Sequence, residues 1–486
     1  MKTGGLRLQS PVLKKEKSMS NTYYLAVDIG ASSGRHILGH LEDGKMVLEE
    51  IYRFDNGMKP KNGHLCWDAD GLFGEIKAGM KRCKELGKIP VSMGVDTWAV
   101  DYVLLDKNGE RLGDAVGYRD KRTEGMDDKV YEIISPEELY ARTGIQKQIF
   151  NTIYQLMAVK EQQPELMDKA EQLLMLPDYF HYLLTGVAKT EYTNATSGQL
   201  VSPVTKDWDF ELIERLGYKK EIFGPISLPG TVVGPLKKEV EEEVGFSCTV
   251  MQPATHDTAS AVLAVPSTEE DVIYISSGTW SLMGTELKEA DCREDSRRAN
   301  FTNEGGVNYR FRFLKNIMGL WMIQSVRKEL PKKYSYGELC EMAEKVSDFP
   351  AVIDVNDGSF LAPDSMIEAI REYCRQHGQR VPETPGELAT VIYQNLARSY
   401  GETVREIEEL TGKHYEKIHV VGGGSNADYL NELTARYTGK EVVAGPGEAT
   451  ALGNLAAQMI AAGELRDIWD ARVCIRNSFE VRSFRA

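Results

Sequence analysis

The amino-acid sequence predicts an α/β protein with two domains. The chain has 486 residues, which is too many for one ordinary hydrophobic core. A unit of apolar strand, polar turn rich in Gly and Ser, and second strand occurs once in each half, beginning at residues 23–27 and 271–275. Near the C-terminus, residues 417–444 follow the strand–helix–strand order of a βαβ unit. We therefore expect one domain at 22–265 and another at 266–486.

Apolar runs separated by turn dipeptides predict the strands. The run YYLAV at 23–27 is continuously apolar, which is typical of a strand buried on both faces. The Asp-Gly dipeptide at 43–44 indicates a hairpin turn after it. A second hairpin is predicted over 96–113, with its turn at the Asn-Gly dipeptide 108–109. In the second half, SLMGTEL at 281–287 is expected to form another strand.

Helices are expected between these strand regions. Residues 136–186 have a helical pattern, and Ser135 is a suitable N-terminal cap for it. A short helix at 258–265 closes the first half. Mixed helical sequence covers about 315–412 and ends at Gly412, a residue typical of helix C-termini.

The composition is that of a soluble globular protein, with 42% hydrophobic and 27% charged residues. A formal net charge of −15 argues against a large basic face for nucleic acid, and no segment reaches the ~18 apolar residues of a membrane span. The seven cysteines are scattered and form no C-x-x-C pair, which argues against a disulfide framework or a zinc site and favours the cytoplasm. Residues 1–21 are polar and basic, so we expect a disordered leader. Small molecules are the expected partners, and the protein is expected to be a monomer or a small homo-oligomer.

Three glycine-rich turns each follow an apolar strand: DIGASSGR (28–35), SSGTWS (276–281) and VGGGSN (421–426). Glycine lets the main chain approach a ligand closely, and backbone N–H groups can then surround phosphates. The chain contains no G-x-x-x-x-G-K-[ST] sequence, which excludes a P-loop, and GPGEATALG at 445–453 does not fit the dinucleotide fingerprint. The three turns therefore indicate a phosphate site of another kind.

Asp28 lies within the first of these turns. A carboxylate beside phosphates would repel them unless a cation stood between, so Asp28 predicts a Mg²⁺ ion that it holds through water. The alternative is that Asp28 only stabilises its own turn.

Two phosphate hairpins, one in each half, form the arrangement of the superfamily that contains sugar kinases, Hsp70 and actin. The chain resembles the FGGY carbohydrate kinases from Tyr23 to beyond residue 460. The resemblance rests on an ordered set of motifs: LAVDIGASSGR, VDTWAVDYVLLD, GYRDKRT, LPDYFHYLLTG, EYTNATSGQL, THDTASAV, YISSGTWSLMG, TNEGG, LKNIMGLWM and VVGGGSN. It implies two actin-like, ribonuclease H-like domains with an ATP and sugar cleft between them.

The resemblance also implies a reaction and a set of site residues. Within the family the chain is most similar to members that phosphorylate L-rhamnulose with ATP to give L-rhamnulose 1-phosphate, with Mg²⁺ as the cofactor. The implied ATP-binding residues are Ala31, Ser32, Ser33, Gly34, Arg35, Thr279, Gln324 and Gly423. The implied sugar-binding residues are Ala99, Asp101, His256, Asp257, Thr258 and Asn316.

Asp257, in THDTAS, allows three interpretations: a helix cap, half of a metal-binding His-Asp pair, or a general base. The other histidines form no cluster that would complete a metal site, so the metal interpretation fails. The residues alone do not rank Asp257 and Asp101 as bases. The resemblance assigns Asp257 as the base and Asp101 as a sugar-binding group, and the base can also cap the helix. For His256 a sugar contact or a structural role is favoured over catalysis.

One position departs from the family pattern. Members commonly have Gly where this chain has Ala99, within the motif TWAVD. An added methyl group at the sugar wall could change which deoxyketose is preferred. A kinase for a related ketose, such as L-fuculose or L-xylulose, is therefore the main alternative function, and a sugar-independent ATPase like actin or Hsp70 is a remote one.

Overall fold

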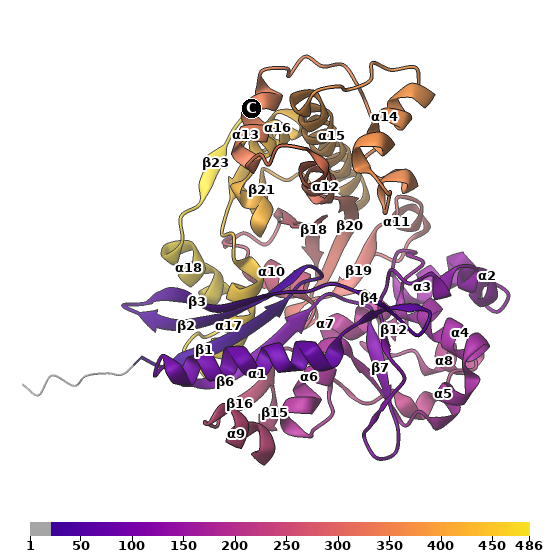
Figure 1. Cartoon of the computed structure of the whole chain (residues 1–486), viewed down its shortest axis with the longest axis vertical. Helices are drawn as coiled ribbons and strands as arrows, with labels where there is room; N and C mark the ends of the chain where they lie inside the picture. The colour runs from indigo at the N-terminus through magenta and orange to yellow at the C-terminus, as the bar shows by residue number, and fades with distance from the viewer. Residues whose placement is uncertain (1–20) are drawn as a thin grey trace, which may run out of the picture.

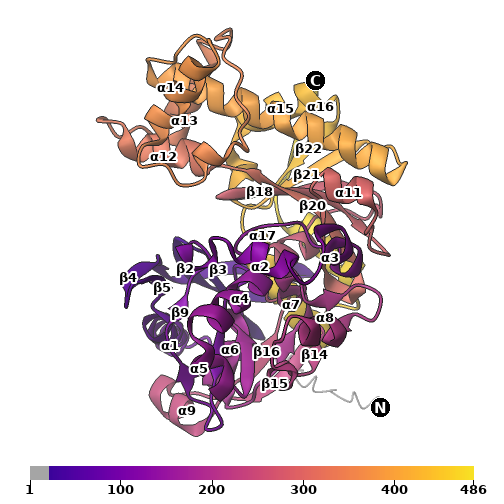
Figure 2. The ribbon, with the colours of Figure 1, turned by 90° about the vertical axis from the view of Figure 1, so that its right-hand side faces the viewer.

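The computed structural model describes residues 21–486 and contains two large sheets, one in each half of the chain (Figure 1). The predicted leader at 1–21 lies outside the described residues except for its last position. Seen from the side, α17 lies between the two sheets (Figure 2), and it packs with α10 in one hydrophobic core. The predicted α/β fold with two related halves is confirmed.

The first large sheet has six strands in the order β15-β16-β6-β1-β2-β3. Its strands are β1 (Tyr23–Ile29), β2 (Ser33–Glu42), β3 (Lys45–Asp55), β6 (Pro90–Thr97), β15 (Thr231–Pro235) and β16 (Thr249–Gln252). The second has seven strands in the order β19-β20-β18-β17-β21-β22-β23. Its strands are β17 (Ile273–Ser277), β18 (Trp280–Leu287), β19 (Thr302–Gly305), β20 (Phe311–Met318), β21 (Lys417–Val421), β22 (Glu441–Ala444) and β23 (Arg482–Phe484).

The two sheets repeat one topology. In the order β3-β2-β1-β6-β16, two antiparallel pairings are followed by two parallel ones. The order β20-β18-β17-β21-β22 has the same pattern. In both halves the turn after the first strand, between β1 and β2 or between β17 and β18, therefore emerges at an equivalent place, which accounts for the two predicted phosphate hairpins.

Four small sheets and the helices complete the fold. The small sheets contain β4 (Lys59–Lys61), β5 (His64–Trp67) and β9 (Ala115–Val116); β7 (Tyr102–Leu105), β8 (Arg111–Leu112) and β10 (Gln172–Met175); β11 (Thr190–Glu191) and β14 (Ile226–Ser227); β12 (Val201–Ser202) and β13 (Asp207–Trp208). The helices are α1 (Ala69–Glu85), α2 (Met126–Tyr131), α3 (Pro136–Thr143), α4 (Thr152–Gln162), α5 (Pro164–Lys169), α6 (Leu176–Thr185), α7 (Tyr192–Ala195), α8 (Phe210–Arg215), α9 (Lys238–Val244), α10 (Asp257–Leu263), α11 (Glu294–Arg298), α12 (Trp321–Glu329), α13 (Tyr336–Glu344), α14 (Met366–Gln376), α15 (Pro385–Thr411), α16 (Asp428–Thr438), α17 (Ala449–Ala461) and α18 (Ile468–Ser478). Short 3₁₀ helices are η1 (Lys121–Thr123), η2 (Thr196–Gly198), η3 (Lys220–Ile222), η4 (Val307–Tyr309), η5 (Gly358–Phe360) and η6 (Gly423–Asn426).

Side-chain alternation along β1 assigns the two faces of the first sheet. Leu25 and Val27 pack into a core with α1 and α6, whereas Tyr24 and Ala26 pack into another core with α10 and α17. Since successive side chains of a strand point to opposite faces, Asp28 continues the second series. The strand therefore directs this carboxylate toward the space between the two sheets.

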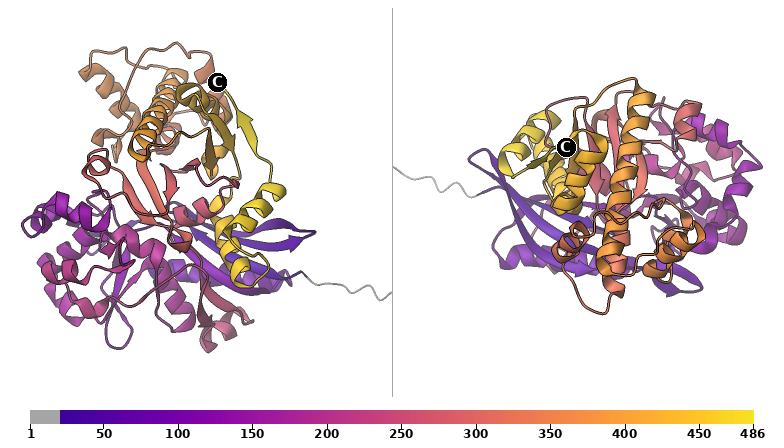
Figure 3. Two further views of the ribbon diagram at one scale, coloured as in Figure 1. Left: turned by 180° about the vertical axis from the view of Figure 1, so that it is seen from behind. Right: turned by 90° about the horizontal axis from the view of Figure 1, so that it is seen from above.

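The layer between the sheets is formed by α10 and α17, which cross in close contact. A Cβ atom at Gly453 would lie 1.8 Å from the carbonyl oxygen of Ser260, so only glycine permits this backbone approach. Asn454 donates to Asp96 of β6 at 2.6 Å, and Gln458 donates to a backbone carbonyl of β1 at 2.9 Å. Helix α17 of the C-terminal half is thus hydrogen-bonded to the first sheet. The view from behind shows helices of the C-terminal half, in yellow, against the indigo strands of that sheet (Figure 3, left). The division of the chain at residue 265 stays a prediction.

The predicted hairpins differ in outcome. The turn at 43–44 joins β2 and β3 as expected. The turn at 108–109 joins β7 and β8, but the strand does not run through from residue 96. Strand β6 ends at Thr97, and Val100 has a left-handed φ of 67°, so residues 98–101 form a kinked loop between two sheets.

The helical predictions need two corrections. The region 136–186 is interrupted by β10, because the apolar run at 172–175 pairs with β7. The region from about 315 begins with the last residues of β20, which pair with β18. The long helix α15 does end where Gly412 adopts the left-handed conformation. No helix within residues 21–486 has the length and apolarity needed to cross a membrane.

Candidate functional site

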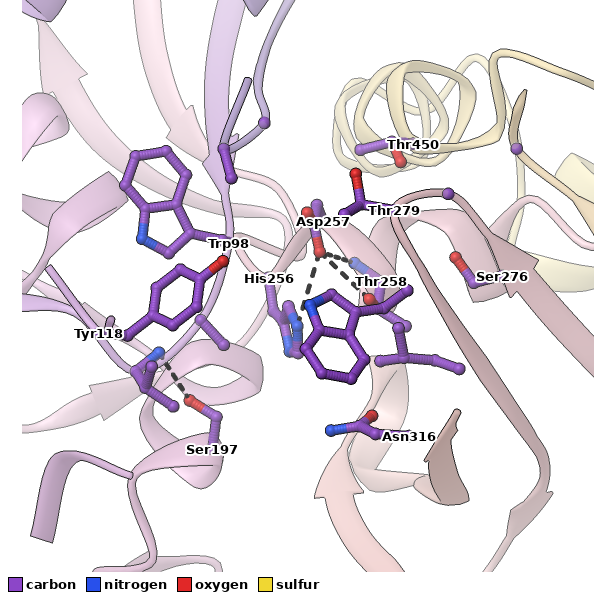
Figure 4. A pocket seen from close by; sticks show the side chains of 18 of the residues that line it. Trp98, Tyr118, Ser197, His256, Asp257, Thr258, Ser276, Thr279, Asn316 and Thr450 are labelled. Atoms are coloured by element: carbon purple, nitrogen blue, oxygen red, sulfur yellow. Dashed lines mark hydrogen bonds and ion pairs between the residues drawn. The ribbon is translucent and has the colours of Figure 1, made fainter. Parts of the chain in front are cut away.

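A cavity of about 320 Å³ lies between the two halves of the molecule (Figure 4). Most of the predicted site residues line it, namely Asp28, Ala31, Ser32, Ser33, Arg35, Ala99, His256, Asp257, Thr258, Thr279, Asn316 and Gly423. They come from the β1–β2 turn, the loop after β6, the start of α10, the β17–β18 turn, β20 and the turn after β21. The fold thus gathers segments that lie up to about 400 residues apart in the chain into one site.

Two predicted ATP-binding residues do not line the cavity. Gly34 lies within β2, where a Cβ atom would meet the ring of Phe54 at 2.1 Å. The lack of a side chain at this position serves packing against that ring. Gln324 is half-buried in α12, outside the cavity wall. Their contact with ATP stays a prediction.

One end of the cavity is formed by the three glycine-rich turns that were predicted to bind phosphate, and it is called the phosphate end below. Ser32 and Ser33 of the β1–β2 turn and Thr279 of the β17–β18 turn line it from opposite halves of the chain. The turn after β21 adds Gly422 and Gly423, the first of which has a φ of 82°. Hydroxyl groups and closely approachable backbone in this arrangement suit a chain of phosphates.

Arg35 stands at this end but is engaged by two carboxylates. Its Nε donates to Asp28 at 3.0 Å, and its Nη1 lies 2.7 Å from Glu448 at the start of α17. Two of its three nitrogens are therefore directed at protein groups. An anion bound here would contact the remaining nitrogen or compete with Glu448.

The other end of the cavity is a wall of aromatic and apolar side chains. Trp98 and Tyr118 face the cavity from the first half (Figure 4), and Trp280 lines it from the second. Phe150 and Ile145 extend the wall. Such a surface suits the apolar faces and the methyl group of a deoxysugar.

The structure revises the role predicted for Asp101. Its carboxylate is buried behind the wall, where it accepts hydrogen bonds from the indoles of Trp67 at 2.6 Å and Trp98 at 2.9 Å. It also accepts from the amide of Gln155 at 3.0 Å and the backbone N–H of Tyr118 at 3.2 Å. With four donors already bound, this carboxylate holds the wall in place and does not reach the cavity.

Asp257 lies at the floor of the cavity, where its side chain is 31% exposed. It is the first residue of α10, and His256 occupies the cap position, which corrects the prediction of Asp257 as the cap itself. Its Oδ1 accepts from the N–H of Thr258 at 2.6 Å and from the hydroxyl of the same residue at 3.1 Å. Among residues 21–486, no partner is recorded for Oδ2, so this oxygen is available to a ligand.

The loop that carries Asp257 is held by a buried glutamate. Glu191 accepts from both the N–H and the hydroxyl of Thr255, at 3.0 and 2.6 Å. The carbonyl of Thr255 in turn accepts from the N–H of Thr97 at 3.0 Å, which ties the loop to the end of β6. This arrangement brings the sugar motif TWAVD beside the THD motif.

Burial and neighbouring carboxylates raise the pKa values of two aspartates near the floor of the cavity, Asp257 and Asp96. Burial and the charge of Asp28 raise the pKa of Asp257 to about 7. Burial, again with Asp28 as the next cause, holds the pKa of Asp96 well above its usual range. A carboxyl group with a pKa near the working pH can accept a proton during turnover.

The residues present fit a magnesium ion of the kind that accompanies nucleotides. No group of three or more His, Cys, Asp or Glu side chains in residues 21–486 is arranged as a metal cage. Mg²⁺ usually needs only one or two carboxylates, with water and phosphate oxygens as its other ligands. Asp28 lines the cavity at the phosphate end, where Arg35 occupies its Oδ2, and within residues 21–486 one buried oxygen of Asp96, on the adjacent strand, has no partner.

Two models of one family match the chain. The model described as "FGGY family of carbohydrate kinases, N-terminal domain" matches residues 23–264, and the C-terminal domain model matches residues 273–462. The chain belongs to the FGGY family of carbohydrate kinases. Membership of this family of sugar kinases accounts for the duplicated topology and for the cavity between the halves.

Curated relatives within the family narrow the comparison. A rhamnulokinase of Halalkalibacterium halodurans is 54% identical, with 95% of this chain and 98% of the relative aligned. A rhamnulokinase of Bacillus subtilis is 47% identical over 95% of both chains. Among solved structures, a ligand-bound xylulose kinase from Lactobacillus acidophilus superposes with a TM-score of 0.78 at 17% identity, covering 96% of this chain and 94% of that one. Glycerol kinase from Plasmodium falciparum with ADP gives 0.72 at 14% identity, covering 95% and 94%. These structures share the fold.

Sequence reasoning missed several residues of the site. Tyr118, Glu304 and Ser197 lie in GYRDKRT, TNEGG and EYTNATSGQL, which marked the family without assigning these residues a role. Gln146 lines the cavity with a buried amide oxygen that has no partner within residues 21–486, and no motif marks it. Because these residues reach the cavity only through tertiary packing, their positions have no signature along the chain.

Proposed function

We propose that this sugar kinase transfers the γ-phosphoryl group of ATP to L-rhamnulose, giving L-rhamnulose 1-phosphate, and that Asp257 is the general base. The observation that carries the proposal is the free Oδ2 of Asp257 at the floor of a cavity with a phosphate end and an aromatic end. The names of the curated relatives support rhamnulose as the sugar.

The residues divide the work as follows. The turns at Ser32 and Thr279 surround the phosphates, and Arg35 contributes positive charge beside them. Asp28 would hold a Mg²⁺ ion that comes with ATP, and this ion would supply positive charge that neutralises the phosphates during the transfer. The wall holds the sugar so that its hydroxyl faces Oδ2 of Asp257, which takes the proton late in the transfer.

The cavity also offers acceptors for sugar hydroxyl groups. Asn316 and Gln146 line the cavity, and each has a buried side-chain oxygen for which the described part of the chain offers no partner. A buried acceptor without a hydrogen bond is costly, so a ligand that donates to it is favoured over one that lacks the hydroxyl. We therefore infer that these two side chains accept hydrogen bonds from hydroxyl groups of the ketose.

A coupled ATP assay over L-rhamnulose, L-fuculose, L-xylulose, L-ribulose and D-xylulose tests the proposal. We expect the highest kcat/KM with L-rhamnulose. A higher value with L-fuculose or L-xylulose would support the related-ketose alternative, and steady ATP hydrolysis unaffected by any sugar would support the actin- or Hsp70-like alternative.

The Ala99→Gly variant tests the sugar wall. Ala99 lines the cavity beside the acceptor site, and one carbon more or less in a binding wall changes discrimination by roughly 10-fold or more. We expect the ratio of kcat/KM for L-rhamnulose to that for L-fuculose to shift by about 10-fold, with kcat/KM for ATP hydrolysis alone unchanged. An unchanged ratio would remove Ala99 as a specificity residue.

The pH dependence follows from the pKa of Asp257. A base whose pKa is raised to about 7 is increasingly protonated below that pH, so kcat/KM should fall about 10-fold per pH unit there. In the pH profile of kcat, the fall on the acid side should lie at lower pH than in the profile of kcat/KM. The reason is that a cation bound together with ATP offsets the charge of Asp28. A kcat/KM that stays level down to pH 5 would contradict the assignment.

A further inference from the structure

A buried arginine of the C-terminal half contacts the residue next to the proposed base. Arg312, on β20, has a side chain that is 0% exposed. Its Nη2 lies 3.0 Å from Nδ1 of His256, and its Nε donates to the carbonyl of Gly305 at 3.0 Å. Its Nη1 lies 3.1 Å from Glu304, the neighbouring carboxylate on β19. The guanidinium is thus held from two further directions while it faces the imidazole.

This contact determines which ring nitrogen of His256 carries the proton. A guanidinium is always protonated and can only donate, so the nitrogen that it faces must be an acceptor. The neutral ring then carries its proton on Nε2. Burial and the charge of Arg312 both lower the pKa of His256, which keeps the ring neutral.

Glu304 is the group that could favour the other tautomer. Its Oε2 lies 3.3 Å from Nδ1 of His256 and would accept a proton donated from there. The same oxygen forms an ion pair with Nη1 of Arg312 at 3.1 Å, which supplies the compensating charge. Nη2 of Arg312 lies nearer to Nδ1, at 3.0 Å, and a guanidinium cannot accept a proton, so we assign Nδ1 as the acceptor.

The proton on Nε2 faces the base. Nε2 of His256 lies 3.5 Å from Oδ1 of Asp257, the oxygen that also accepts from Thr258 (Figure 4). Contacts of this length in an empty site commonly shorten when the substrates are bound. Oδ1 accepts from both donors of Thr258, and the Nε2–H would add a third when the contact shortens, so Oδ2 is left for the acceptor hydroxyl.

We propose that Arg312 is a positioning residue for phosphoryl transfer, which sets the Nε2–H tautomer of His256 so that this N–H holds Oδ1 of Asp257 and presents Oδ2 to the sugar. The inference rests on the proposed role of Asp257 as the base. It also assigns a function to the TNEGG motif, whose glutamate orients Arg312, and it makes the geometry of the base depend on the C-terminal half.

The tautomer is measured directly by NMR of the full chain labelled with ¹⁵N in the histidine rings. The His256→Gln variant lacks the signal of this residue and so assigns it. We expect the wild-type spectrum to show a neutral ring with the proton on Nε2. A proton on Nδ1 would overturn the proposal while leaving the kinase activity itself in place.

The kinetic test is a double-mutant cycle. Arg312→Met combined with Glu304→Gln removes both buried charges together, so neither is left unpaired. We expect this pair of substitutions to lower kcat about 10- to 100-fold in the wild-type background. In a His256→Gln background the same pair should cause no further loss, because the glutamine amide carries protons at the position of Nε2 without any choice of tautomer. An equal loss in both backgrounds would assign Arg312 a purely structural role and overturn the proposal.

Arg310→Met is the matched control. Arg310 lies two residues before Arg312 and pairs with Glu286 at 3.4 Å, away from His256. The kcat of the Arg310→Met variant, and the ¹⁵N spectrum of His256 in that variant, should match those of the wild type. If no ketose is phosphorylated by the wild-type protein, the proposed function fails, and that result is distinct from a wild-type spectrum that shows the other tautomer.

Discussion

Asp257→Asn should lower kcat about 10²- to 10⁴-fold, the range that a positioned general base contributes. The amide keeps the shape of the side chain and its place at the start of α10, but it cannot take a proton from the acceptor hydroxyl. Sugar and ATP should therefore still bind, with KM values close to those of the wild type. Single-turnover measurement of phosphoryl transfer separates this loss from any change in product release.

The same variant should be at least as stable as the wild type above pH 7. A carboxyl group whose pKa is higher in the folded than in the unfolded chain loses stability for the fold as pH rises through that range. Replacing it by a neutral amide removes this cost, so thermal unfolding at pH 8 should show an equal or higher Tm.

Asp271→Asn, which removes an exposed carboxylate outside the cavity, is the control and should keep full activity. A kcat for Asp257→Asn within twofold of the wild type would end its role as the base.

Removal of divalent cations should lower the rate about 10³-fold or more, because charge neutralisation by a metal ion supplies several kcal/mol to phosphoryl transfer. Excess chelator should abolish turnover and added Mg²⁺ should restore it, as measured in the coupled assay. Turnover that persists in chelator would contradict the role proposed for Asp28.

Asp28→Asn provides a second readout of this site. The variant should require more Mg²⁺ for half-maximal rate, because one carboxylate ligand is lost. The charge of Asp28 also contributes to the raised pKa of Asp257. The lower limb of the kcat/KM profile should therefore move to lower pH in this variant, which a purely structural role of Asp28 would not produce.

The linear motifs predicted much of the site because phosphate turns depend on local backbone. Each of these turns follows directly from a buried strand, so Ser32, Thr279 and Gly423 could be identified along the chain and are found at one cavity. The strand alternation that directs Asp28 toward this cavity is likewise a local property.

The residues that orient the site are of another kind. The family resemblance implies a sugar-binding role for Asp101, whereas its carboxylate accepts hydrogen bonds from Trp67 and Gln155, which are 34 and 54 residues away in the chain. Glu191 reaches Thr255 over 64 residues, and Arg312 reaches His256 over 56. No local pattern encodes such contacts, since each depends on how separate elements pack.

The sequence by itself determined the duplicated α/β topology and the three glycine-rich turns, since these depend on short-range periodicity and on glycine placement, and its ordered motifs carried the family resemblance that assigned the candidate base. Only the tertiary structure decided which oxygen of Asp257 is free, that Asp101 supports the wall instead of lining it, and that Arg312 faces His256. These features depend on burial and on hydrogen bonds between distant segments, and both arise only when α10 and α17 bring the two sheets together.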